Sequence, residues 1–143
     1  PEGQPPRILS PDEKVARLRR FADRVVTLQP TPHFLAQTPE QFVRSLVEAH
    51  RPVAVIEGPD FHFGRDRAGT LDVLRTLGTL HGFDTIIEPR TEVALTDQLL
   101  APVSSSLVRW LIGRGRVVDA ALCLGEPFTL RGEVVRGEQQ GRK

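Results

Sequence analysis

The sequence has one cysteine, no methionine, and no apolar run close to the roughly 20 residues that a membrane-spanning helix needs. With a single cysteine, Cys123, an internal disulfide is excluded, and its apolar neighbours indicate a small buried hydrophobe in a reducing cytoplasm rather than a reactive thiol. We therefore expect a soluble, cytoplasmic protein. The chain opens Pro1-Glu2-Gly3 with no initiating methionine and no signal-peptide pattern, so we expect a fragment or a processed product.

Net charge is also small, because nineteen basic residues face eighteen acidic ones and leave a formal charge of +1. Such a balance gives no sequence-independent grip on the phosphates of a nucleic acid, so no nucleic-acid or membrane partner is predicted. Hydrophobic residues make up 39% and charged residues 26% of the 143 residues, which excludes intrinsic disorder and allows one domain with a real core. The sequence does not indicate an oligomeric state.

Helix and strand patterns alternate over most of the chain. The predicted helices run from Ser10 to about Asp23, from Thr38 to Arg51 and from Thr70 to Gly82, and the predicted strands cover 24–28, 52–56 and 84–88. Each helix opens on a serine or threonine cap, and the third is expected to turn Leu71, Leu74, Leu77 and Leu80 inward. The strand at 52–56 has no polar alternation, which is typical of a strand covered on both faces. The pattern predicts an α/β domain with a parallel sheet.

Two further helices are predicted at 104–112 and 117–124, after a stretch to which no element is assigned. From Phe128 the pattern changes to alternating residues bounded by glycines, which predicts a strand over 129–137. We interpret Gly125 to Lys143 as the entry into a different, all-β domain.

The loop from Gly58 to Gly69 follows the central predicted strand, and ligands of parallel sheets bind at the carboxyl ends of strands. Its glycines allow a backbone to approach a ligand closely, and its arginines offer planar forks to phosphate oxygens. The alternative is an ordinary surface loop, in which Phe61 and Phe63 enter the core, Asp60 forms a turn and His62 is solvated.

A second candidate site is Ser104-Ser105-Ser106 with Arg109 one turn later. Free backbone amides at a helix start bind anions, and the arginine is placed to assist them. The alternative is that the serines are only caps. Two phosphate-binding segments in one α/β domain suggest a nucleotide ligand. Trp110 could stack on a base, although packing is the simpler role, and no histidine has metal-ligand spacing.

These segments are similar to motifs of a known family. Gly58 to Gly69 resembles the G-x-D-F-x-F-G-x-x-R-x-G loop of the prokaryotic bifunctional riboflavin kinase and FAD synthetase, and Val103 to Arg109 resembles its I-S-S-T-x-I-R motif. Gly115 to Phe128 resembles the following G-x-V-x-x-A-x-x-L-G-R-P-[YF] stretch, and Leu9 to Val43 also follows the family. The resemblance covers nearly the whole chain.

The resemblance implies a Rossmann-like nucleotidylyltransferase fold with a parallel sheet, lacking its first strand and followed by the first strand of a truncated β-barrel. Residues 1–124 would be the C-terminal part of an FMN adenylyltransferase domain, and residues 125–143 the start of a riboflavin kinase domain. The domain would transfer AMP from ATP to FMN, giving FAD and pyrophosphate with Mg²⁺.

The resemblance also assigns roles to residues. Arg109 would be catalytic and would bind the ATP pyrophosphate together with Ser104, Ser105 and Ser106. The residues expected to receive FMN and nucleotide are Gly58, Asp60, Phe61, Phe63 and Gly64.

Three departures from the family pattern bear on activity. The H-x-G-H motif would precede Pro1, the kinase P-T-A-N motif would follow Lys143, and Leu107 stands where an arginine is usual. The fragment is therefore expected to be inactive alone. The alternatives are a nucleotidylyltransferase of this fold with another acceptor and a degenerate, non-catalytic nucleotide or flavin binder.

Overall fold

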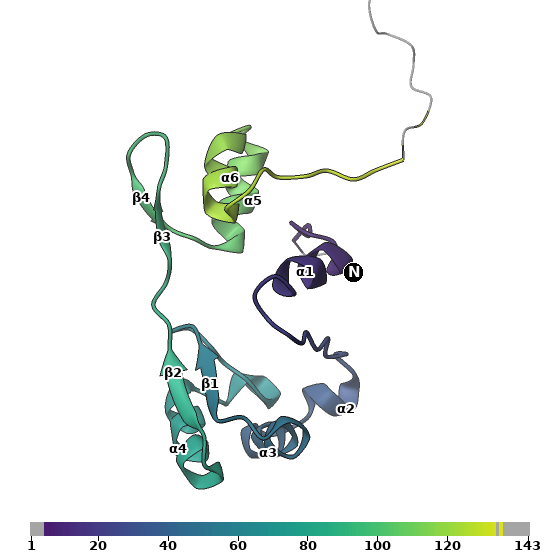
Figure 1. The fold of residues 1–143 in the computed structure, drawn as a ribbon, viewed down its shortest axis with the longest axis vertical. Coiled ribbons are helices and arrows are strands. Elements are labelled where there is room, and N and C mark those ends of the chain that lie inside the picture. The colour runs from purple at the N-terminus through teal and green to yellow at the C-terminus, as the bar shows by residue number, and fades with distance from the viewer. Residues whose placement is uncertain (1–4, 134, 136–143) are drawn as a thin grey trace, which may run out of the picture. The chain divides into compact units, whose positions relative to one another are not determined.

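The structure, a computed structural model, describes residues 5–133 and 135 (Figure 1). The chain divides into two compact units, which we describe separately. The sheet unit is Leu9–Thr91, and the hairpin unit is Pro1–Ile8 together with Glu92–Lys143. No helix among the described residues is long and apolar enough to cross a membrane.

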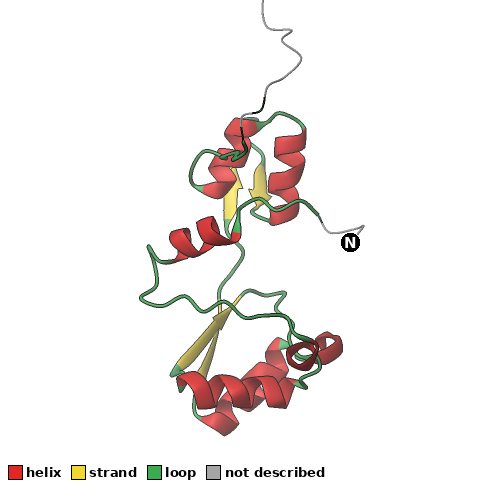
Figure 2. Cartoon of the chain, turned by 90° about the vertical axis from the view of Figure 1, so that its right-hand side faces the viewer, coloured by secondary structure: helices red, strands yellow, loops and turns green. Residues whose placement is uncertain are grey.

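The sheet unit contains a parallel pair of strands with helices against them (Figure 2). Its elements are α1 (Pro11–Leu18), α2 (Pro32–Leu35), α3 (Pro39–His50), β1 (Ala54–Glu57), α4 (Leu71–His81) and β2 (Asp84–Ile87). Strand β1 pairs with β2 in parallel from Ala54↔Asp84 to Glu57↔Ile87, with α4 between them in the chain. This confirms the prediction of an α/β arrangement with a parallel sheet.

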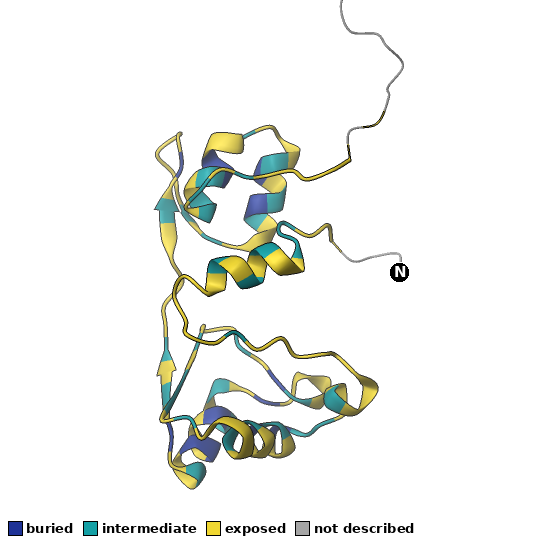
Figure 3. Cartoon of the chain, turned by 45° about the vertical axis from the view of Figure 1, so that its right-hand side comes forward, coloured by how far each residue is buried: buried dark blue, intermediate teal, exposed yellow. Residues whose placement is uncertain are grey.

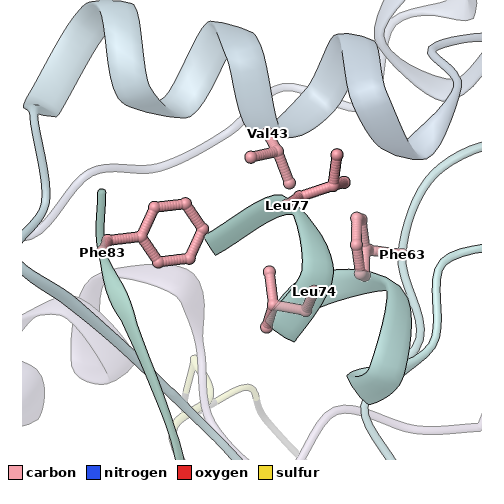
Figure 4. Close-up of a cluster of buried hydrophobic side chains, with 5 residues drawn as sticks. All are labelled: Val43, Phe63, Leu74, Leu77 and Phe83. Carbon is pink, nitrogen blue, oxygen red and sulfur yellow. The ribbon is translucent and has the colours of Figure 1, made fainter. Parts of the chain in front are cut away.

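The core of the sheet unit lies between the helices and one face of the sheet (Figure 4). Its buried members are Val43 of α3, Leu74 and Leu77 of α4, Phe63 of the loop after β1, and Phe83 just before β2. The local caps formed as predicted: Thr38 and Thr70 accept hydrogen bonds from the backbone amides of Gln41 and Val73. Sequence spacing thus placed α3 and α4 correctly.

The prediction that the strand at 52–56 is covered on both faces is wrong. Ile56 of β1 and its register partner Ile86 of β2 are 58% and 42% exposed. Figure 3 colours the chain by burial class. The core side chains from α3 and α4 all lie against the opposite face. A strand without polar alternation therefore does not guarantee that both its faces are buried.

The expected inward position of Leu80 is also wrong, since it is 74% exposed. The buried face of α4 is made by Leu74, Leu77 and Gly78. At about 100° per residue, Leu80 is rotated away from that face.

Two predictions near the start of the chain fail as well. Helix α1 ends at Leu18 rather than near Asp23, and residues 24–28 form no strand. The helix buries none of its residues, so nothing stabilises further turns. Val26 and Leu28 are about half exposed, and the segment has no partner strand within the described chain. Strand propensity alone does not make a strand without one.

The hairpin unit has an antiparallel hairpin followed by two helices. Its elements are β3 (Glu92–Ala94), β4 (Leu100–Pro102), α5 (Ser105–Gly113) and α6 (Val117–Leu124). Both helices were predicted, but the hairpin was not. Leu95, Leu111 and Ala120 form its buried core. Residues 129–133 and 135 have no regular structure, and residues 134, 136 and 137 of the predicted strand lie outside the described residues. The boundary at residue 125 therefore stays a prediction.

A buried carboxylate joins the hairpin turn to α6. Asp119 accepts hydrogen bonds from the backbone amide of Thr96 at 2.7 Å and from its hydroxyl at 3.1 Å. The Nε of Arg116 also donates to Asp119 at 2.6 Å, and its Nη2 lies 2.8 Å from an oxygen of Asp97. The Thr96 amide is the main reason why the pKa of Asp119 is lowered, and the Arg116 and Thr96 side chains add to this effect.

Asp119→Asn should lower the free energy of unfolding near pH 7, and this difference should shrink in acid. Because the pKa of folded Asp119 lies below its ordinary value of 3.8, its carboxylate stabilises the fold above that value. The contribution is lost as the pH falls through the folded pKa. Urea unfolding of both proteins between about pH 7 and about pH 3 measures the difference. A destabilisation that stays constant in acid would show that the charge of Asp119 is not its cause.

Candidate functional site

The loop after β1 folds back on Phe63. The backbones of Phe63 and Gly69 exchange two hydrogen bonds of 3.1 and 2.8 Å, which close the loop. A side chain at Gly69 would have its Cβ 2.7 Å from the Phe63 ring, so only glycine fits there. Phe63 is buried in the core of the sheet unit, as the surface-loop alternative expected for it, and Phe61 packs against that core.

The same loop is seated on the start of α3. The Arg65 amide donates to the Gln37 carbonyl at 2.7 Å. Gly64 has a φ of +71°, and a Cβ there would lie 2.8 Å from the Pro39 nitrogen. Asp66 and Arg67 also have positive φ values, 55° and 58°, which are uncommon for residues other than glycine. Such strained backbone occurs most often at ligand sites.

A row of aromatic rings leads from the loop into α3 and α2. Phe61 stacks on Phe63 with ring centroids 5.4 Å apart, and Phe63 lies 5.5 Å from Phe42. Phe34 then meets Phe42 edge-on at 6.0 Å. Phe34 and Phe42 line an apolar cavity of about 220 Å³ that also includes Leu46. Packed rings therefore link the loop to the apolar cavity, and one of these rings, Phe63, is buried in the core.

A polar cavity adjoins the apolar one. Its volume is about 410 Å³, and its walls include His33, Gln41 and Arg44. Gln37 and Ser45 line both cavities. The region thus offers apolar and polar surfaces next to each other, a combination typical of small-molecule sites.

Charged side chains gather where the two parallel strands end. The carboxylate of Asp60, three residues after β1, forms an ion pair with the guanidinium of Arg90, three residues after β2. His62 Nδ1 lies 2.9 Å from the Asp60 carbonyl and 3.4 Å from Nη2 of Arg67. Sequence reasoning missed Arg90, although its place after the second strand of a parallel pair was a usable signal.

Glu57, the last residue of β1, lies at the same end of the sheet. Partial burial raises the pKa of its carboxyl group above the ordinary value. Perturbed carboxylates occur often at functional sites, and this one adds a titratable group beside the loop.

The serine segment of the hairpin unit caps a helix. Ser104 Oγ accepts the Leu107 amide at 3.1 Å, so the structural role of this serine is realised. The amides of Ser105 and Ser106 have no hydrogen-bond partner among the residues described. Free amides at a helix start are donors of the kind that bind anions, so the predicted anion site at these serines stays a prediction.

Arg109 lies one turn into α5, with Nε donating to the Pro6 carbonyl at 2.7 Å. Its two Nη groups have no partner in the described part of the chain and are available to bind an anion. The role predicted for Arg109 toward an anion stays a prediction. Trp110 is not a buried packing residue, since it is 49% exposed, and the Arg114 guanidinium lies 5.5 Å from the centre of its ring.

The predicted site residues therefore form two groups, each within its own unit. Gly58, Asp60, Phe61, Phe63 and Gly64 belong to the sheet unit, and the serines and Arg109 belong to the hairpin unit. Over the described ranges there is no group of three or more His, Cys, Asp or Glu residues that could hold a metal ion. Cys123 is partly buried and its pKa is raised by burial, as expected for an unreactive thiol.

The fold and the loop define an α/β protein with a candidate phosphate and ring-binding region at the carboxyl end of a parallel pair of strands. The sequence profile of the FAD synthetase family matches residues 1–99. The chain belongs to the FAD synthetase family. The matched range contains the Gly58 to Gly69 loop and ends before Ser104.

Several curated proteins are similar over most of the chain. The bifunctional riboflavin kinase/FMN adenylyltransferase of Escherichia coli (strain K12) is 29% identical over 153 residues, which cover 99% of this chain and 47% of the relative. The protein of the same name from Pseudomonas fluorescens is 32% identical, with 99% and 48% covered. An FAD synthetase of Listeria monocytogenes is 28% identical, with 83% and 46% covered. The chain spans about half the length of the curated relatives it matches.

A solved structure has the same fold. The crystal structure titled as a macrolide-efflux protein from Streptococcus pneumoniae superposes with a TM-score of 0.76 at 28% identity. The match covers 94% of this chain and 41% of that one. The likeness supports the mixed α/β architecture with its small parallel sheet.

Proposed function

We propose that this chain is part of a bifunctional riboflavin kinase and FMN adenylyltransferase, in which it contributes to transferring AMP from ATP to FMN. The family match and the relatives support the activity. The observation that carries the proposal is the loop at the end of the parallel strands, where the partly exposed Phe61 follows the Asp60–Arg90 ion pair. We infer a nucleotidylyltransferase fold for the domain on the same grounds.

The reaction needs alignment and charge neutralisation more than covalent help from the protein. An oxygen of the FMN phosphate attacks the α-phosphorus of ATP, and the bond from that phosphorus to the bridging oxygen breaks, so pyrophosphate leaves. The free amides of Ser105 and Ser106 are suited to the pyrophosphate oxygens. Arg109, with its two Nη groups, would stabilise the charge that accumulates there.

The sheet unit would receive the flavin. A planar, largely apolar ring packs well against aromatic side chains, and the partly exposed Phe61 of the loop supplies such a surface. Gly58, Asp60 and Gly64 shape the loop through which the polar part of the substrate would approach.

The family resemblance also implies Mg²⁺. Magnesium is usually held by one or two carboxylates together with substrate phosphates, so it does not need a cluster of protein ligands. Asp60 is the loop carboxylate that fits this mode. When bound, the ion would neutralise phosphate charge.

A non-catalytic flavin or nucleotide binder is the second candidate, and Leu107 in place of the usual arginine favours it. A nucleotidylyltransferase with another acceptor is a variant of the first. The FMN adenylyltransferase, the non-catalytic binder and the enzyme with another acceptor each lead to a different expected result for the full-length protein.

The test is FAD formation by the full-length protein from ATP and FMN, with pyrophosphate release measured in parallel and riboflavin phosphorylation measured separately. We expect FAD and pyrophosphate in equal amounts. Flavin binding without FAD formation would favour the binder. Pyrophosphate release with another acceptor but not with FMN would favour the variant enzyme.

A further inference from the structure

Arg90 occupies a position that no family motif accounts for. It follows β2, whereas its ion-pair partner Asp60 belongs to the loop that follows β1. The two strands end side by side, because Glu57 pairs with Ile87 in the parallel register. Asp60 and Arg90 therefore both lie at the end of the sheet where ligands of such folds bind. The arginine side chain is 55% exposed, and Asp60 is its only side-chain partner among the described residues.

We propose that Arg90 binds the phosphate group of the flavin substrate, a proposal that rests on the function proposed above. Arginine presents a planar fork of donors that matches phosphate oxygens, and its single contact with Asp60 leaves donors of that fork available. The neighbouring Arg67, near His62 of the same loop, adds positive charge at this end of the sheet.

The ion pair with Asp60 does not prevent this role. Both partners are more than half exposed, and ion pairs of this kind add little stability, so a phosphate can compete for the guanidinium. Arg90 also offsets the negative charge of Asp60, which would otherwise repel an anion from the loop.

The flavin phosphate is favoured over the ATP phosphates by what lies next to Asp60. Phe61, the next residue, begins the aromatic row that leads through Phe63 to the apolar cavity. A substrate with a phosphate at one end and a planar ring at the other matches a charged group beside the partly exposed ring of Phe61, since the next ring of the row, Phe63, is buried in the core. Among the two substrates of the proposed reaction, FMN carries a single phosphate and the larger apolar ring system.

The test compares Arg90→Ala and Arg90→Lys in the full-length protein through steady-state FAD formation. Lumiflavin, which has the flavin ring but no ribityl chain or phosphate, serves as a competitive inhibitor against FMN. We expect Arg90→Ala to raise the KM for FMN on the order of 10-fold or more, with the KM for ATP and the inhibition constant of lumiflavin unchanged. Arg90→Lys should recover part of the affinity, since it keeps the charge and loses the fork.

Arg75→Ala is the matched control. Arg75 forms a similar exposed pair with Asp72 on α4, outside the site, and Arg75→Ala should change none of these three constants. A rise in the KM for ATP alone would assign Arg90 to the nucleotide phosphates and overturn the proposal. An equal weakening of FMN and lumiflavin would show damage to the loop and would also overturn it. If the parent protein forms no FAD, the proposed function itself fails, and this inference with it.

Discussion

Gly64→Val in the full-length protein is expected to reduce FAD formation on the order of 100-fold or more and to leave riboflavin phosphorylation near normal. The new Cβ would lie 2.8 Å from the Pro39 nitrogen, a backbone atom that cannot move aside without shifting the start of α3. The residue would also have to hold a φ of +71°. Strain of this kind and overpacking each cost about 1–3 kcal/mol.

The physical reason for so large an effect is that Gly64 seats the loop. If the loop leaves α3, the hydrogen bond from Arg65 to Gln37 and the contact of Phe63 with Phe42 are disturbed together. These contacts hold the region that we propose for the flavin. Riboflavin phosphorylation would belong to another domain and therefore reports on general misfolding.

The matched control is Gly113→Val, at the end of α5, where a Cβ meets no atom within 4 Å. It should retain both activities. Equal loss of both activities in Gly64→Val would indicate collapse of the whole protein. If a folded Gly64→Val variant forms FAD at the rate of the parent protein, the loop is an ordinary surface loop and not part of the site.

Arg109→Ala should lower the rate of FAD formation on the order of 100-fold, equivalent to about 3 kcal/mol lost from one transition-state contact. The reason is that Arg109 lies one turn from the free amides of Ser105 and Ser106, and Leu107 offers no second charge. Arg109→Lys should recover only part of the rate, because a lysine lacks the planar fork.

Arg109 also has a structural contact, and the experiment must distinguish its loss from the loss of pyrophosphate binding. Arg109 Nε donates to the Pro6 carbonyl, so its loss also removes a tether of the N-terminal segment. A tether alone would change the unfolding midpoint and leave the rate within about threefold of the parent. Arg114→Ala, which removes an exposed arginine from beside Trp110, controls for loss of charge in the same unit.

The candidate site was partly accessible from the sequence. The loop from Gly58 to Gly69 was predicted from its composition and from its place after a strand, and the structure puts it at the end of the parallel pair. The sequence analysis offered a ligand-binding loop and a surface loop with Phe63 in the core as alternatives. The structure buries Phe63 in the core. The pairing of Arg90 with Asp60 and the contact of Phe42 with Phe63 were missed, because they join residues far apart in the chain.

The sequence by itself determined the starts of α3, α4 and α5. Ser104, Thr38 and Thr70 cap helices as predicted, since a cap hydrogen bond joins residues three apart and needs no distant partner. The α5 and α6 helices followed from spacing for the same reason.

Only the tertiary structure decided which strand patterns become strands and which faces are covered. Residues 24–28 form no strand for want of a pairing partner, whereas the segment at 92–102 forms a hairpin whose turn is held by buried Asp119 of α6. Ile56 stays exposed because α3 and α4 both pack on the other face of the sheet. Strand pairing, burial and ion pairs such as Asp60 with Arg90 depend on residues distant in the chain, and local sequence patterns carry no information about those partners.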